Sequence, residues 1–486
     1  MTTSDQTFAA HVRGLEAGLA AYAFTSEKAS TFLDGTDVAA FYERQWNSDG
    51  GRARLRNRTP LMIERDRILY SHEMRRMTDK YHILYQGSDR ILRNYTTQTL
   101  RTAHVARSVA SALRLNAHFA EGLALGAKVG AVPFVHRAKH VADVFMREKI
   151  AEIDRAQEGA RPAVTDHSLQ AELFTDEQIP LPAWVQIISD NGVASHVARF
   201  VPWAAGDSEG AAYSSGQESY WLLTTDVFLR RPRNRSFLPQ TMYGIWQHSM
   251  GATARPGSFV HRSRLWRGDH YTGITWEHAT HEAHVVQYAD DITWVIENLS
   301  DANTAAALAG KGNDVYTKLA SYLGRNHAPE AVINRVNDRD SGGLYTYFIA
   351  DLITSSEARF AACREVAPTP CRDALLVALS DGAQSVLDTM VKFLESSVFA
   401  DLRVVNRNRM VAAITQACLE ILYDGDLRIL ERFIESRSLV EGWLPDDRQR
   451  AVELLNNPVH RAQLAIDILA SMSDREVYDF AGLEVT

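Results

Sequence analysis

The chain is predicted to be mostly α-helical, because apolar residues recur at helical spacing along most of its 486 residues and strand signals are few and short. We expect helices over 100–113, 120–128, 238–248, 275–299 and 375–394. The first of these places Leu100, His104 and Val109 on or near one face, among small residues that suit close packing. The second is strongly apolar and is broken at Gly130 and Pro133.

The composition fits a large water-soluble protein: 45% of the residues are hydrophobic and 23% are charged. No apolar run reaches the roughly 18 residues that a membrane span needs, and the start lacks the layout of a signal peptide. Cys363, Cys371 and Cys418 show no C-x-x-C spacing, which favours reduced thiols in a cytoplasm and argues against a zinc ribbon. A net charge of −8 makes nucleic-acid binding unexpected without a local basic patch.

Five segments carry the motifs of one known family, in the family's order. They are Arg65–Ser71 with Met74–Met77 and Lys80, Arg101–His104, Leu123–His136, Tyr288–Asp301 and Ala470–Arg475. Together they resemble the HD-domain deoxyguanosine triphosphate triphosphohydrolases, from about residue 55 to about residue 480. The resemblance implies a multi-helical HD-domain fold. It also implies an N-terminal helical extension (1–54), an HD-like core (55–305, with an insertion near 141–220) and a C-terminal helical region packed on the core (306–486).

The metal-binding motif of that family is degenerate in this chain. An adjacent His-Asp pair supplies two of four metal ligands in the family, and Ala127 and Lys128 stand at those positions here. A methyl group and an ammonium have no lone pair to offer a cation. By resemblance, His104 matches the first ligand and Asp290 (less well Asp291) matches the last. Two ligands are too few to hold the family's Mg or Mn ion tightly, so we predict no metal cofactor and expect Lys128 to pair with Asp290 instead.

The catalytic positions are altered too. His136 matches the family's catalytic histidine, but Lys139 stands where a glutamate would orient it, and Ala131 replaces a polar residue. Lys128 and Lys139 place positive charge where a phosphate would meet the metal, which favours phosphate binding without hydrolysis; a pair of solvated surface lysines is the alternative. If the chain is an enzyme after all, His136 with Lys128 or Lys139 are the candidate catalysts.

Other ligand-binding candidates follow from the same resemblance. The family's N-terminal run approaches the nucleotide, and the matching basic residues are Arg65, Arg67, Arg75 and Lys80. Arg101, His104 and Asp290 complete the set of predicted ligand-binding residues.

Three histidines on the helix that leads to Asp290 offer another way to build a metal site. His278, His281 and His284 lie about 120°, 180° and 240° around the helix axis from Asp290 and therefore face away from it. We predict a structural role or a weak surface metal site for them, and not a transplanted catalytic centre.

The sequence therefore predicts a non-hydrolysing protein that binds a nucleotide or another phosphorylated small molecule. It would act as a homo-oligomeric regulator or as the partner of an active enzyme. The alternative is an active (d)NTP triphosphohydrolase with an unusual site, or a metal-independent enzyme that re-uses the same pocket. Neither a membrane nor a nucleic acid is an expected partner.

Overall fold

The computed structural model describes residues 7–29, 31–32, 34–80, 93–134, 237–247, 279–308, 315–363, 376–425, 427–441, 443–456 and 458–481, with short pieces between 138 and 149 and between 218 and 232. Nearly all the regular structure in these residues is helical. Its strands are β1 (Thr225–Asp226) and β2 (Arg231–Pro232), two residues each and paired antiparallel. The mostly-α prediction is therefore confirmed.

The described helices of the first half of the chain are mostly short. They are α1 (Phe8–Glu16), η2 (Ser26–Lys28), α2 (Val38–Trp46), α3 (Gly51–Leu55), α4 (Pro60–Leu69), α5 (His72–Arg75), η3 (Arg76–Asp79), α6 (Tyr95–Ala112), α7 (Ala117–Gly126) and α12 (Pro239–Gln247).

The second half contains the longer helices. They are α13 (His281–Leu308), α14 (Val315–Arg325), α15 (Glu330–Asn337), α16 (Ser341–Ala362), α17 (Asp381–Phe393) with the π-helical turn η8 (Leu394–Val398), α18 (Leu402–Asp424), α19 (Leu427–Glu441), α20 (Pro445–Leu454), α21 (Pro458–Ser471) and α22 (Asp474–Phe480). Among the described helices, none is both long and apolar enough to cross a membrane.

Side-chain caps decide where the central helices begin. The Asn94 side chain accepts a hydrogen bond from the backbone N–H of Thr97 (2.9 Å), so α6 begins five residues before the predicted start at 100. Asn116 begins α7 in the same way, and Ser380 begins α17. The apolar period shows which face of a helix is buried but not where its cap lies, which explains the differences from the predicted bounds.

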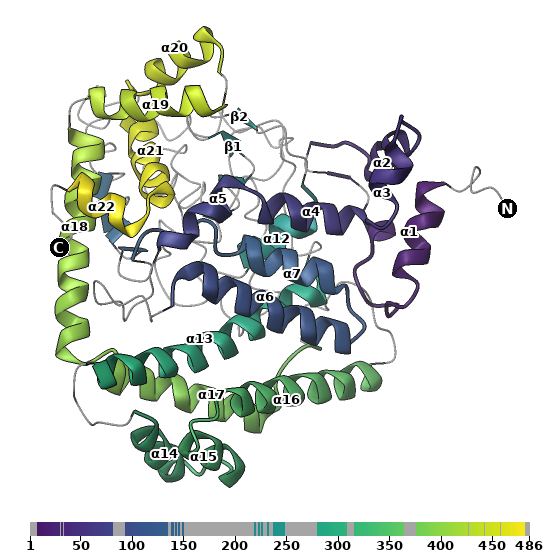
Figure 1. Ribbon diagram of the computed structural model, residues 1–486, viewed down its shortest axis with the longest axis vertical. Helices are drawn as coiled ribbons and strands as arrows, with labels where there is room; N and C mark the ends of the chain where they lie inside the picture. Colours follow the sequence, from purple (N-terminus) through teal and green to yellow (C-terminus); the bar gives the residue numbers. More distant parts are fainter. Residues whose placement is uncertain are drawn as a thin grey trace, which may run out of the picture.

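Helices α6, α7 and α13 pack against one another at the centre of the molecule, with α4 and α12 against α7 (Figure 1). Small residues permit this close approach. A Cβ added at Gly244 of α12 would lie 2.8 Å from the Leu123 methyl groups of α7. Helices α6, α7 and α13 carry Arg101–His104, the start of Leu123–His136, and Tyr288–Asp301, which belong to three of the five family-like segments.

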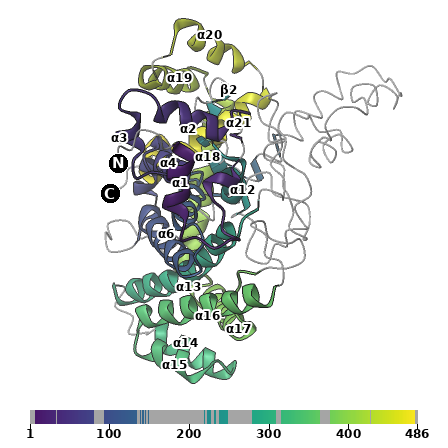
Figure 2. The same cartoon turned by 90° about the vertical axis from the view of Figure 1, so that its right-hand side faces the viewer.

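Buried side chains form two clusters. The first runs from Phe8 to Val404 and includes the α6–α7–α13 centre. The second joins residues 132–145 and Leu222 to the helices α18–α22. Turned by 90°, the molecule shows α14 and α15 at one end of its long axis and α19 and α20 at the other (Figure 2). The predicted domain boundaries near residues 54 and 305 stay predictions, and most of the predicted insertion lies outside the described residues.

Candidate functional site

An ion pair between Lys128 and Asp290 joins the end of α7 to the middle of α13. Lys128 comes two residues after the last residue of α7, and its Nζ lies 2.6 Å from Asp290 Oδ2. Only 12% and 11% of the two side chains are exposed. The pairing predicted from the loss of the metal ligands is therefore confirmed.

Two residues of α6 complete the surroundings of this pair. The Thr102 hydroxyl donates a hydrogen bond to Asp290 Oδ1 (3.2 Å) and is fully buried. Tyr95, at the start of α6, is also buried; burial raises the pKa of its hydroxyl, while the nearby Lys128 charge lowers it. Neither residue was a predicted site residue. Asp290 thus receives an ammonium on one oxygen and a hydroxyl on the other.

The charges at this site are unevenly matched. Burial opposes the charged form of Lys128, but the adjacent Asp290 carboxylate outweighs it, so the pKa of Lys128 is raised. A single ammonium neutralises one carboxylate. Burial and the Asp290 charge raise the pKa of the neighbouring Asp291 to about 7, although Gln287 and Lys128 oppose this. The site therefore holds the ion pair of Lys128 and Asp290 and, beside it, the Asp291 carboxyl, whose pKa is raised to about 7.

His104 does not reach this pair. Its side chain is exposed, and at about 100° per residue it lies about 200° around α6 from Thr102, which touches Asp290. His104 therefore does not line the Lys128–Asp290 pair, and its predicted role in ligand binding stays a prediction. Leu100, predicted on the same packed face, is 49% exposed. The buried face of α6 includes Thr102, Ala103, Ala106 and Ala110 together with the larger Tyr95, Val105 and Val109.

Lys80 lies in the interior. It is fully buried, and its Nζ donates hydrogen bonds to the backbone oxygens of Ala131 and Ala470, each at 2.6 Å. Burial lowers the pKa of Lys80 to about 7, although the charge of Asp474 opposes the shift. Lys80 thus connects the segment after Lys128 to the end of α21. A direct contact of Lys80 with a ligand stays a prediction.

Arg65 belongs to a separate charged cluster at the other end of α7. Its guanidinium contacts Glu121 Oε2 (3.1 Å), His118 Nδ1 (2.8 Å) and Asp66 (2.7 Å). His118 is the second residue of α7 and Lys128 follows its end, so the two sites are about 15 Å apart along the helix. The structure therefore does not bring Arg65 to Lys128.

The remaining predicted arginines lie on three different helices. Arg101 forms an ion pair with Glu297 of α13, whose other oxygen accepts a hydrogen bond from the Tyr345 hydroxyl (2.9 Å). This contact ties α6 to α13 and α16. Arg67 is half-buried in α4, and Arg75 is exposed at the end of α5. Ligand contacts of these three residues stay predictions.

The predicted catalytic residues are only partly placed. His136 lies outside the described residues, whereas Lys139 is described and half-buried. The combination of His136 with Lys128 or Lys139 therefore stays a prediction.

The histidines at the start of α13 are interior residues. His281 is fully buried with its ring edge-on to Phe360 (5.2 Å between centroids), and His284 is 4% exposed. Burial lowers the pKa of His284 to about 3, and the His281 charge adds to the shift. His278 lies outside the described residues. The placement of His281 and His284 fits the predicted structural role.

The residues at the Lys128 site do not suit a metal ion. The Lys128 ammonium occupies one oxygen of Asp290, and a cation brought there would be repelled by it. Across the part of the chain that the structure describes, no three His, Cys, Asp or Glu side chains are grouped to hold a metal. We therefore derive no metal-dependent step at this site.

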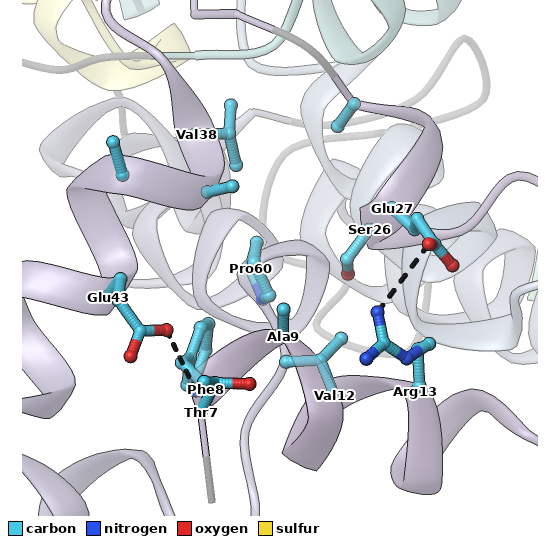
Figure 3. Close-up of a pocket in the computed structure, with 13 residues that line it drawn as sticks. Thr7, Phe8, Ala9, Val12, Arg13, Ser26, Glu27, Val38, Glu43 and Pro60 are labelled. Atoms are coloured by element: carbon cyan, nitrogen blue, oxygen red, sulfur yellow. Dashed lines mark hydrogen bonds and ion pairs between the residues drawn. The ribbon is translucent and has the colours of Figure 1, made fainter.

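A hollow lies elsewhere, between α1, η2 and α2 (Figure 3). It has a volume of about 560 Å³ and is lined largely by alanines, valines and Pro60. The ion pair Arg13–Glu27 (3.6 Å) lies on one side, and on the other Glu43 accepts a hydrogen bond from the Phe8 N–H (2.8 Å). Its described lining contains none of the predicted site residues, so it is separate from the Lys128 site.

Part of the chain is similar to known proteins, although no family model matches it. Three relatives carry the description deoxyguanosinetriphosphate triphosphohydrolase-like protein. One from Caulobacter vibrioides is 39% identical over 93 residues, 19% of this chain and 24% of the relative. One from Caldanaerobacter subterraneus subsp. tengcongensis is 34% identical over 110 residues, 22% of this chain and 32% of the relative. One from Bordetella pertussis is 31% identical over 123 residues, 24% of this chain and 32% of the relative.

These matches cover about a quarter to a third of each relative and about a fifth of this chain. The family that the motifs resemble is thus supported by moderate identity, but over a much shorter stretch than the predicted span from residue 55 to residue 480.

Proposed function

We propose that this chain is a non-hydrolysing relative of the triphosphohydrolase-like proteins, which binds a nucleotide or another phosphorylated small molecule. In this proposal it acts as a homo-oligomeric regulator or as the partner of an active enzyme. The partial similarity to those proteins supports the ancestry. The single observation that carries the loss of hydrolysis is the Lys128–Asp290 ion pair.

The chemical argument starts from what an ammonium can do. A divalent metal polarises a phosphate and lowers the pKa of a bound water, and both effects need open coordination positions. The Lys128 ammonium offers one positive charge and no such position. Its raised pKa keeps it protonated at neutral pH, so it cannot accept a proton from water. It crosslinks α7 and α13, but it does not activate a nucleophile.

Phosphate binding remains chemically open to the same residue. Lys128 uses one of its three N–H donors on Asp290, and its side chain is 12% exposed. A phosphate oxygen could accept one of the other two donors. Because Asp290 already balances the charge, such binding needs further cations, and Lys139 is the nearest in sequence among the predicted site residues.

One observation favours the alternative of a metal-independent enzyme. The carboxyl of Asp291 has its pKa raised to about 7, and a group with that pKa can both donate and accept a proton at neutral pH. In that case Asp291 joins His136, Lys128 and Lys139 as a candidate catalyst.

Titration calorimetry with dGTP and with inorganic triphosphate, alongside a triphosphate-release assay, separates the two functions. The proposal expects heat of binding without release, and at least fivefold weaker binding in Lys128→Met. Lys318→Met, an exposed lysine on α14, is the matched control and should bind like the wild type. Steady release of triphosphate from dGTP would contradict the proposal, and so would binding of neither dGTP nor inorganic triphosphate.

A further inference from the structure

The segment Ala470–Arg475, which the sequence singles out as a motif, folds back onto the segment that carries Lys128. Ala470 O accepts a hydrogen bond from Lys80 Nζ (2.6 Å), and Asp474 Oδ1 accepts one from the backbone N–H of Phe134 (2.9 Å). The residues of the second bond are 340 positions apart in the sequence. The C-terminal helices thus contact the residues that directly follow Lys128.

Lys80 bridges segment 127–134 and the end of α21, and we call this set of contacts the junction. Its Nζ also donates to Ala131 O (2.6 Å), and the backbone N–H of Ala131 donates to Lys128 O (3.0 Å). Two successive hydrogen bonds therefore link Lys80 to the backbone of Lys128. The backbone N–H of Gly130 also donates a hydrogen bond to the Ser219 hydroxyl (2.8 Å). The segment 127–134 is held from several sides at once.

Burial makes this junction costly to break. Lys80, Ala131, Phe134 and Asp474 are each at most 5% exposed. A hydrogen-bonded charge in the interior cannot exchange its partner for water, so losing one contact leaves a buried polar group unmatched.

The backbone at Phe134 also depends on the junction. Its φ of 55° lies in the left-handed region, which bulky residues rarely adopt. The surroundings must therefore impose it. Asp474 holds the Phe134 N–H, and the Tyr478 ring of α22 meets the Phe134 ring edge-on at 5.2 Å.

We propose that Lys80 and Asp474 are positioning residues, through which the C-terminal helices α21 and α22 hold segment 127–134 in the conformation that presents Lys128 to Asp290. The C-terminal helices then control whether the phosphate site is formed, and displacing them weakens binding. The expected effect on phosphate binding rests on the proposed function. The coupling, by which the C-terminal helices hold the conformation of segment 127–134, does not.

The test compares Asp474→Ala with Asp474→Asn and with the control Asp479→Ala. Asparagine keeps an acceptor for the Phe134 N–H, and Asp479 lies on the same helix in an exposed ion pair with Arg475. Amide hydrogen exchange of residues 127–134 is measured against that of α6. We expect exchange in 127–134 to rise at least tenfold in Asp474→Ala with α6 unchanged, to recover largely in Asp474→Asn, and to stay at the wild-type rate in the control.

Inorganic triphosphate serves as the binding probe in the same variants, and its Kd should rise at least fivefold in Asp474→Ala alone. Wild-type exchange of 127–134 in Asp474→Ala would overturn the coupling, as would an equal rise throughout the molecule. If Asp474→Ala does not fold, Lys80→Met is judged by the same exchange criterion. A clear exchange effect, with binding of neither dGTP nor inorganic triphosphate even in the wild type, would uphold the coupling and refute the proposed function instead.

Discussion

Lys128 Nζ and Asp290 Oδ2 lie 2.6 Å apart where α6, α7 and α13 meet, although the two residues are 162 positions apart in the sequence. Asp290 belongs to α13 and Lys128 to the turn that follows α7, so their contact fixes how the end of α7 sits against α13. The Thr102 hydroxyl on the other oxygen of Asp290 brings α6 into the same contact. A metal would join these helices with two charges, and here one ammonium and one hydroxyl join them.

Lys128→Met should lower the free energy of unfolding by about 3 kcal/mol, because it leaves the largely buried Asp290 without its partner. Denaturant unfolding measures the loss, and the exposed Lys318→Met is the control. The double variant Lys128→Met/Asp290→Leu should regain most of the stability, since an apolar pair leaves no buried charge. A single variant with a wild-type unfolding curve would refute the view that this pair stabilises the fold.

The free energy of unfolding should fall as pH rises from about 5 to about 7, because three buried carboxyls outnumber His118 and His284, whose lowered pKa values act in the opposite direction. Burial raises the pKa of Glu64, Glu282 and Asp291 to about 7 each. Between the ordinary carboxyl pKa and this value the folded state binds more protons than the unfolded state, so each step up in pH favours unfolding. Denaturant midpoints recorded from pH 5 to pH 7 measure the trend; above pH 7 the lowered pKa of Lys80 acts in the opposite direction.

Glu282→Gln isolates one of these groups. Oε1 of Glu282 accepts hydrogen bonds from the N–H groups of Phe24 (2.9 Å) and Asn116 (3.0 Å), and an amide oxygen can keep both. The variant should therefore gain on the order of 2 kcal/mol relative to the wild type at pH 8 and little at pH 5. The exposed Glu431→Gln should leave the pH profile unchanged. A Glu282→Gln profile parallel to that of the wild type would show that Glu282 does not titrate in this range.

The sequence predicts well what depends on chemistry at one position or on a repeating period. The resemblance places Lys128 and Asp290 at positions that face each other, and the need of a carboxylate for a cation predicts their pairing, which the structure shows. The helical class follows from the apolar period in the same way.

The rest depends on how helices pack. Thr102 and His104 are both polar residues on α6, and the sequence does not say which of them faces α13. Thr102 does, and His104, about 200° further around the helix, is exposed. The burial of Lys80 could not be predicted either. Its partners are backbone oxygens far away in the chain, and a backbone oxygen is present at every residue whatever its type.

The position of Thr102 leads to a prediction about metal binding. We expect the wild-type protein to carry no stoichiometric Mn, Fe, Co or Ni by elemental analysis. Ala127→His with Lys128→Asp should remain metal-free, because His104 points to solvent. Adding Thr102→His should allow about one Mn²⁺ per chain, since this imidazole would face Asp290. Asp290→Ala in that background is the control and should abolish binding. Tight Mn²⁺ binding without Thr102→His would show that His104 can reach the site.

The wild-type protein should release no measurable triphosphate from dGTP or other dNTPs, with or without added Mn²⁺. Lys128 occupies the carboxylate that a metal would need, its raised pKa prevents it from acting as a base, and Lys139 cannot orient an imidazole as a glutamate would. Loss of a metal removes several kcal/mol of transition-state stabilisation, and about 1.4 kcal/mol is tenfold in rate. The variant with Ala127→His, Lys128→Asp and Thr102→His should bind Mn²⁺ without hydrolysing dGTP, because Lys139 is still in place. Robust dNTP hydrolysis by the unmodified chain, abolished by His136→Ala, would establish the enzyme alternative instead.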